Sequence, residues 1–320
     1  MSNDAKVARR SFKHDPSIRL NAEEFLRSLV GNEVGILLSF DPIARLGRDP
    51  EGIHQLRVCA RRLRSELKVM APALKAAPLS SLLDELQWMG RVLGGQRDLD
   101  VLFDLLKTVN VDLSPPLEHS VFRNLRQRQA TKKRKVEELL ASKRYRHLVG
   151  TLADAALHPP LRGSGATPAI EFLRPGLERT VTKLFTAVEH FGPEPTNLEL
   201  HQIRILAKRA RYSAEVASML LGEPAKDLGA SLERVQSVLG NLHDCCVAIE
   251  YLEGETFLCP EGDFTQASQS VRLATQRLDD SIEDLKTKWR EPVERARTLA
   301  AQLFDGKNQS DDAGAQHEVK

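Results

Sequence analysis

An eleven-residue basic segment occurs twice in this chain. The sequence HQLRVCARRLR at 54–64 returns 147 residues later as HQIRILAKRAR at 201–211, with six identical positions. A second pair follows in the same order, LGGQRDLDV at 93–101 and LGNLHDCCV at 239–247. Two matched motifs at nearly the same spacing predict an internal duplication, so the chain is expected to fold as two similar units related by an approximate two-fold axis.

Both units are predicted to be helical. The good helix formers Leu, Ala, Glu, Arg and Lys dominate between the prolines, and no segment shows sustained alternation of apolar and polar residues. Prolines and glycines divide the chain into candidate helices at 22–47, 51–71, 79–93, 98–109, 116–157, 169–190, 198–221, 225–240, 244–254 and 263–304. The predicted fold class is therefore all-α, with two pseudo-symmetric antiparallel helical bundles.

The duplication sets the expected domain organisation. A polar tail at 1–19 precedes one domain at 20–304, in which 20–157 and 169–304 are the two helical repeats. The Pro/Gly-rich segment 158–168 links the repeats, and 305–320 is a second polar tail. No apolar run reaches the roughly 18 residues that span a bilayer, and the four cysteines contain no CxxC pair. We therefore expect a cytoplasmic protein with reduced thiols and no membrane partner.

Each copy of the basic motif places its cations on one face of a helix. At about 100° per residue, the first copy gathers His54, Arg57, Arg61, Arg64 and Lys68 in one stripe. Apolar residues occupy the opposite face, and Arg62 lies on the flank. The second copy repeats this arrangement with His201, Arg204, Lys208 and Arg211 on the stripe and Arg209 on the flank. The chain thus carries two amphipathic helices with the same basic face.

These basic stripes contain almost no acid. A solvated helix face normally mixes signs, because Glu–Lys pairs one turn apart stabilise a helix, yet only Glu215 accompanies the second stripe. Arginine predominates, and its planar guanidinium binds phosphate oxygens in a bidentate manner. From His54 to Lys68 a helix extends about 21 Å, which suits an extended polyanion. If the stripes face one another they form a basic groove, in which an anion would favour protonation of His54 and His201. An ordinary solvated surface is the alternative.

The paired motifs resemble those of the CHAD family, the conserved histidine α-helical domain, over residues 20–304. The resemblance implies two helical bundles with a basic central groove, binding of inorganic polyphosphate, and association with polyphosphate granules. No ExExK signature of the catalytic domain that accompanies some CHAD domains occurs. Together with Lys68 of the first stripe, the candidate polyphosphate-binding residues are His54, Arg57, Arg61, Arg62, Arg64, His201, Arg204, Lys208, Arg209 and Arg211.

The second motif adds possible supporting residues. Arg97 and Asp98 in the first copy correspond to His243 and Asp244 in the second. Each aspartate precedes a predicted helical run, so it is expected either to cap that helix or to orient an arginine of the stripe. The basic run 132–135 either extends the anion surface or forms an ordinary solvated helix surface.

Other functions have weaker support in the sequence. A nucleic-acid backbone is the alternative ligand, but aromatic residues are only 5% of the chain and do not interleave with the stripes to stack bases. No nucleotide-binding loop, nucleophile arrangement or paired-carboxylate motif indicates catalysis, and no cofactor is implied. A metal ion beside so many arginines is electrostatically unfavourable, so metal-binding and phosphatase-accessory roles are the least supported. The sequence identifies no protein partner.

Overall fold

The computed structural model describes residues 20–109, 113, 115–256 and 264–305, and nearly all of them are helical. No β-strand forms among these residues, where only two isolated bridges occur. The prediction of an all-α fold is confirmed, and the two predicted polar tails lie almost entirely outside the described residues. The helices are α1 (Ala22–Leu46), α2 (Pro50–Val69), α3 (Ala76–Val109), α4 (Pro115–Ala141), α5 (Lys143–Leu157), α6 (Ile170–Phe191), α7 (Asn197–Leu221), α8 (Glu223–Thr256), α9 (Phe264–Lys288) and α10 (Arg290–Asp305).

The structure joins some helices that the sequence separates and divides others. α3 and α8 run through the second motif without a break, so the predicted ends at 93 and 240 are wrong. A glycine inside a helix costs only about 1 kcal/mol relative to alanine, and no proline stands at either predicted break. Conversely, the predicted helix 116–157 is divided because Ser142 caps α5, accepting a hydrogen bond from the Tyr145 N–H at 3.0 Å. The predicted helix 263–304 is divided at Trp289.

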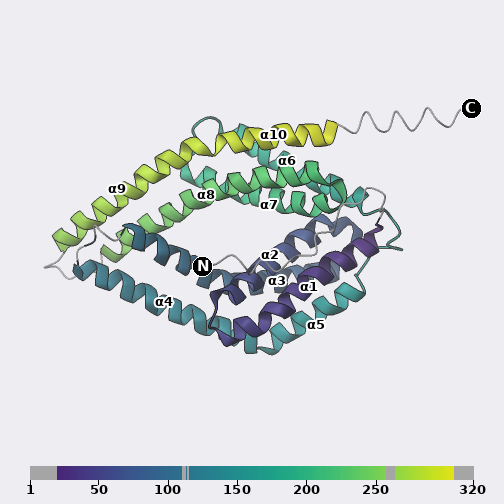
Figure 1. Cartoon of the computed structure of the whole chain (residues 1–320), viewed down its shortest axis with the longest axis horizontal. Coiled ribbons are helices and arrows are strands. Elements are labelled where there is room, and N and C mark those ends of the chain that lie inside the picture. Colours follow the sequence, from purple (N-terminus) through teal and green to yellow (C-terminus); the bar gives the residue numbers. More distant parts are fainter. Residues whose placement is uncertain (1–19, 110–112, 114, 257–263, 306–320) are drawn as a thin grey trace, which may run out of the picture.

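The helices pack around two hydrophobic cores. α1, α2, α5 and the first part of α3 share one core, whereas most of α6 and α7–α10 share the other. In Figure 1, α7, α8 and α10 run along the upper side of the molecule and α1, α4 and α5 along the lower side. α3 passes from one core to the other, because Leu93 belongs to the first core and Leu106 to the second. α4 does the same, with Leu117 in the second core and Val136 in the first, so α3 and α4 join the two halves as well as the segment 158–168.

α2 and α7 carry the two basic motifs, and both begin at a side-chain cap. Asp49 caps α2 and Thr196 caps α7, so the start of each helix is fixed by a local hydrogen bond. The apolar faces that the sequence predicts are buried, with Leu56, Leu63 and Ile203 at 0% exposure. α2 and α7 also contact each other, and Figure 1 shows their ribbons near the centre of the molecule.

Candidate polyanion-binding groove

A cleft of about 360 Å³ lies beside the basic face of α2. Arg57, Arg61 and Arg64 of α2 line it, together with residues of α3 between 86 and 98. Lys208 reaches the same cleft from α7, in the other half of the chain. Both copies of the basic motif therefore contribute cations to one cleft, which can hold an anion.

Arg61 and Lys208 bring the two basic stripes together. The guanidinium carbon of Arg61 lies 5.2 Å from the centroid of the Tyr212 ring on α7. Burial lowers the pKa of Lys208 to about 8, and the charges of Arg61 and Arg204 act in the same direction. Burial also lowers the pKa of Arg61. Within the described part of the chain, no carboxylate forms an ion pair with Arg61, Arg204 or Lys208.

Two glycines leave space for two arginines of the stripes. A Cβ atom on Gly94 would stand 3.6 Å from the Nε of Arg57, and one on Gly240 would stand 3.7 Å from the Nε of Arg204. Each arginine stem therefore lies directly against the neighbouring helix, α3 or α8. Gly94 and Gly240 occupy matched positions of the second motif, so both halves pack a stripe arginine against the same glycine, at a distance that would still admit a Cβ. The repeated Leu-Gly pair is visible in the sequence, but sequence reasoning did not identify it as the place where a stripe arginine packs against a glycine.

The aspartates of the second motif do not cap helices. Asp98 and Asp244 lie inside α3 and α8, so the capping prediction is wrong. A carboxylate oxygen of Asp98 instead lies 3.1 Å from a guanidinium nitrogen of Arg57, an arrangement that orients this arginine. Burial raises the pKa of Asp244, while the nearby charge of Arg204 opposes that rise. Each aspartate thus lies near an arginine of its own half.

Three histidines surround the start of the two stripes. The rings of His201 and His243 pack with centroids 4.4 Å apart. Burial lowers the pKa of His243 to about 4, and the nearby charge of Arg204 contributes. Burial also lowers the pKa of His54 and of His201, and Arg97 adds to the effect on His54. All three rings are therefore mainly neutral at pH 7 in the free protein.

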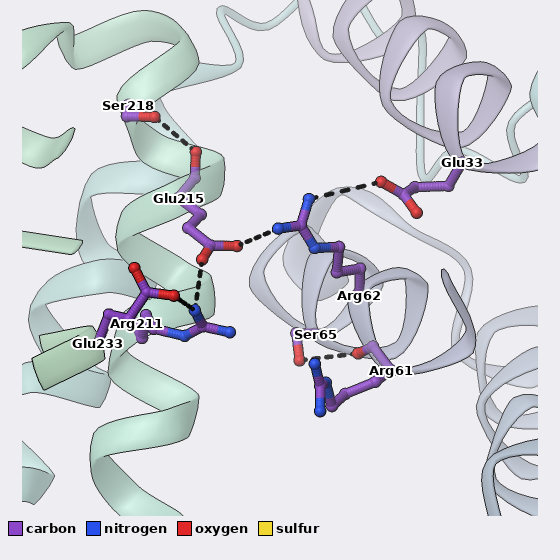
Figure 2. Close-up of polar contacts among 8 residues, drawn as sticks. All are labelled: Glu33, Arg61, Arg62, Ser65, Arg211, Glu215, Ser218 and Glu233. Atoms are coloured by element: carbon purple, nitrogen blue, oxygen red, sulfur yellow. Dashed lines mark hydrogen bonds and ion pairs between the residues drawn. The ribbon is translucent and has the colours of Figure 1, made fainter. Parts of the chain in front are cut away.

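Arg62 and Arg211 of the predicted groove each lie between two carboxylates (Figure 2). Arg62 lies 3.2 Å from Glu215 and 4.0 Å from Glu33, and Arg211 lies 2.7 Å from Glu233 and 3.2 Å from Glu215. Burial acts to lower the pKa of Arg211, which is only 7% exposed, but Glu215, Tyr212 and Glu233 together raise it overall. The α7 stripe itself has only Glu215 beside it, as the sequence indicates, but Glu233 of α8 adds a second carboxylate that helical periodicity of the α7 segment cannot reveal.

A further group of cations lies toward the C-terminal end of α2. Arg64 donates a hydrogen bond of 3.0 Å to Gln87 of α3. Burial lowers the pKa of both Arg64 and Lys68, and the charge of Arg209 from α7 acts in the same direction. Arg91 of α3 also lowers the pKa of Arg64 and lines the cleft. Sequence reasoning missed Gln87 and Arg91, although both lie within two helical turns before the repeated Leu-Gly pair.

The basic run 132–135 is divided between two environments. Lys132 is half-buried, and its Nζ lies 3.1 Å from the position that a Cβ on Gly95 would take. Gly95 itself lines the cleft, so Lys132 lies near its edge. The other three residues of the run are exposed. Most of the run is therefore solvated helix surface, as one of the two alternatives expects.

Several other expectations concern groups outside the cleft. Among the described residues, no set of three or more His, Cys, Asp or Glu side chains is arranged to hold a metal ion. None of the helices in the described segments has the length and apolar character of a membrane span. No disulfide joins Cys59, Cys245 and Cys246, of which the first two are buried, and Cys259 lies outside the described residues.

Comparison with known proteins gives both a family and a fold. The CHAD domain family model matches residues 23–253. An uncharacterized protein found in two strains of Mycobacterium tuberculosis is 28% identical over 232 residues, which is 70% of this chain and 44% of that protein. The chain therefore spans less than half the length of these relatives.

Two solved structures share the fold. The crystal structure of the CHAD domain from the plant Ricinus communis matches with a TM-score of 0.67 and 25% identity, covering 87% of this chain and 94% of that chain. PptA from Streptomyces chartreusis matches with a TM-score of 0.61 and 20% identity, covering 89% and 100% respectively. The family match includes both copies of the basic motif, both copies of the second motif and the whole cleft. The chain belongs to the CHAD domain family, which is commonly linked to polyphosphate binding.

Proposed function

We propose that this chain binds inorganic polyphosphate in the cleft between α2, α3 and α7, without catalysing its conversion. The observation that carries the proposal is the concentration of positive charge at the cleft. Arg61, Arg204 and Lys208 lie close together and partly buried, and no carboxylate in the described part of the chain pairs with them. Membership of a family commonly linked to polyphosphate supports the same conclusion.

Holding these cations together costs free energy when no ligand is present. The pKa of Lys208 falls to about 8 because the side chain is buried among guanidinium groups, so its charged form is destabilised in the folded state. A polyanion with about one negative charge per phosphate would remove most of this repulsion. Relief of repulsion therefore adds to the direct attraction between phosphate and cation.

The arginines are also positioned before any ligand arrives. Arg57 lies against Gly94 while Asp98 contacts its terminal nitrogen, and Arg61 lies over the Tyr212 ring. A guanidinium that is already fixed loses less rotational freedom when it binds phosphate, and its fork can contact two oxygens at once. These features favour a ligand made of phosphate groups.

Nucleic acid fits the same cleft less well. Proteins that bind single strands commonly stack bases on aromatic side chains. The aromatic ring beside this cleft, Tyr212, is 2% exposed, and the guanidinium groups of Arg61 and Arg211 lie 5.2 and 4.7 Å from its centroid. A base therefore has no access to this ring, whereas a phosphate chain does not need one.

Titration of the chain with long-chain polyphosphate at two salt concentrations tests the proposal. We expect binding whose affinity falls steeply with salt, because each phosphate contact releases a counterion. The double charge reversal Arg57→Glu with Arg204→Glu should abolish binding and preserve helical content, whereas Lys288→Met on α9 should bind as the wild type does. Absent or salt-independent binding contradicts the proposal, as does full binding by the charge-reversed protein.

Two further assays separate polyphosphate binding from its alternatives. Competition among polyphosphate, duplex DNA and tRNA should leave polyphosphate bound, and preferential retention of nucleic acid would favour the alternative ligand. A phosphate-release assay with polyphosphate and triphosphate should give no release above background, and sustained turnover would contradict a purely binding role.

The proposal extends to the cell. We expect a fluorescent fusion of the chain to gather on cytoplasmic polyphosphate granules and to disperse when polyphosphate synthesis is removed. Diffuse fluorescence in cells that contain granules would contradict this part of the proposal.

A further inference from the structure

The two copies of the basic motif differ in charge around one shared arginine. At the shifts of 147 and 146 residues that align the copies, Arg64 matches Arg211. Three nearby positions do not keep their charge: Lys68 matches Glu215, Gln87 matches Glu233, and Arg91 matches Ser237. The first copy therefore surrounds its arginine with two cations and an amide, and the second surrounds it with two carboxylates and a hydroxyl.

The structure places this arginine in the same contact in both halves. A guanidinium nitrogen of Arg64 lies 3.0 Å from the side-chain oxygen of Gln87, between α2 and α3. A guanidinium nitrogen of Arg211 lies 2.7 Å from a carboxylate oxygen of Glu233, between α7 and α8. The amide oxygen of Gln87 orients Arg64 and leaves its charge available, whereas two carboxylates, from Glu233 and Glu215, neutralise the buried Arg211.

The surroundings of the two arginines strengthen this difference. Arg211 is 7% exposed and also contacts Glu215 at 3.2 Å, as Figure 2 shows. Arg64 lines the cleft, and its pKa is lowered by burial and by the charges of Arg209 and Arg91, which outweigh the opposing charge of Asp84. Around this matched arginine, positive charge therefore accumulates on the α2–α3 side, whereas on the α7–α8 side it is cancelled.

We propose that a polyphosphate chain leaves the cleft over the α2–α3 side alone, along Arg64, Lys68 and Arg91, and that Gln87 sets this direction by remaining neutral. At the matched position of the α7–α8 side, carboxylates hold Arg211 and no phosphate binds. The inference rests on the proposed function. It assigns polyphosphate binding to the α2–α3 side and excludes it at the matched position of the α7–α8 side.

The test uses a matched pair of variants of the full chain. Gln87→Glu places a carboxylate opposite Arg64 in the geometry that Glu233 already adopts opposite Arg211, so the contact between helices is retained. Loss of one phosphate contact should weaken polyphosphate binding by about five- to tenfold near 0.1 M salt and make the slope of log K against log salt less negative by about 1. Glu233→Gln makes the reciprocal change, and because Glu215 still pairs with Arg211, its affinity should change by less than about twofold.

Two more variants separate charge from structure. Gln87→Met keeps position 87 neutral while it removes the oxygen that accepts the hydrogen bond from Arg64. The slope of log K against log salt should therefore remain that of the wild type. Arg64→Gln should lose the same single contact as Gln87→Glu, which gives a second route to the result if that protein does not fold. Circular dichroism of every variant checks its helical content.

The outcomes distinguish the inference from the proposed function. If the wild type does not bind polyphosphate, the proposed function fails. If the wild type binds but both Gln87→Glu and Arg64→Gln keep its affinity and salt slope, the one-sided path is wrong. The path is also wrong if Glu233→Gln strengthens binding as much as Gln87→Glu weakens it, because both sides would then carry phosphate.

Discussion

The free-energy cost of burying positive charges together in the cleft can be measured at Lys208. We predict that Lys208→Met increases the free energy of unfolding at pH 7 and weakens polyphosphate binding. Methionine preserves most of the apolar stem and removes the charge that burial and the adjacent arginines disfavour. A fall in the pKa of Lys208 from 10.5 to about 8 corresponds to about 3 kcal/mol of differential interaction, which is an upper limit for the gain in stability.

The predicted gain depends on pH in a definite direction. Below pH 8 the Lys208 amine is charged in both the folded and the unfolded state, so the wild type is destabilised by the full free energy of burying this charge. Between about pH 8 and pH 10.5 the folded state has released a proton that the unfolded state still holds, so the wild type becomes more stable as pH rises. The advantage of the variant should therefore shrink across this range.

Urea unfolding of both proteins at about pH 7 and about pH 10 measures the difference. Lys288→Met, which removes one charge from α9, controls for the change in net charge. A Lys208→Met protein that is no more stable than the wild type at pH 7 would refute the reasoning. An advantage that is the same at both pH values would also refute it, because the gain would then not come from the charge of Lys208.

Three further predictions follow from the groove. Polyphosphate affinity should rise as pH falls through 6.5, because the pKa values of His54 and His201 are lowered in the free protein and a bound polyanion raises them; proton uptake on binding, measured by calorimetry in two buffers, checks this. Gly94→Leu should displace Arg57 and weaken binding by about tenfold, whereas Gly94→Ala, whose Cβ would stand 3.6 Å away, should bind normally and gain about 0.5–1 kcal/mol of helix stability in urea unfolding. Arg62→Met should lower the free energy of unfolding by about 1–3 kcal/mol while changing polyphosphate affinity by less than about threefold, and a large loss of affinity at unchanged stability would contradict the ion-pair role of Arg62.

Local sequence pattern was enough to predict the helices that carry the site. The face of α2 that contains Leu56 and Leu63 is buried, as its spacing predicts, because amphipathic periodicity is a property of one helix. The helix ends predicted at 93 and 240, next to glycines, were wrong because they depend on contacts between helices. Whether a glycine ends a helix depends on what packs against it, and at Gly94 and Gly240 an arginine side chain from another helix packs against the glycine.

The partners of individual arginines could not be predicted from one stripe at a time. Arg64 and Arg211 occupy the same position of the motif, yet one contacts an amide and the other a carboxylate. Those acceptors stand on α3 and α8, more than 20 residues away in the chain. Only the packing of helices against one another decides which cations remain available to a ligand and which are used to hold the fold together.

A crystal structure of the chain with bound polyphosphate tests the central claim most directly. The account predicts successive phosphates between α2 and α7, within hydrogen-bonding distance of Arg61 and Lys208, with Arg211 still paired to its glutamates. Phosphates bound instead on the exposed surface of α4, or a ligand that leaves Arg61 and Lys208 without contact, would contradict it.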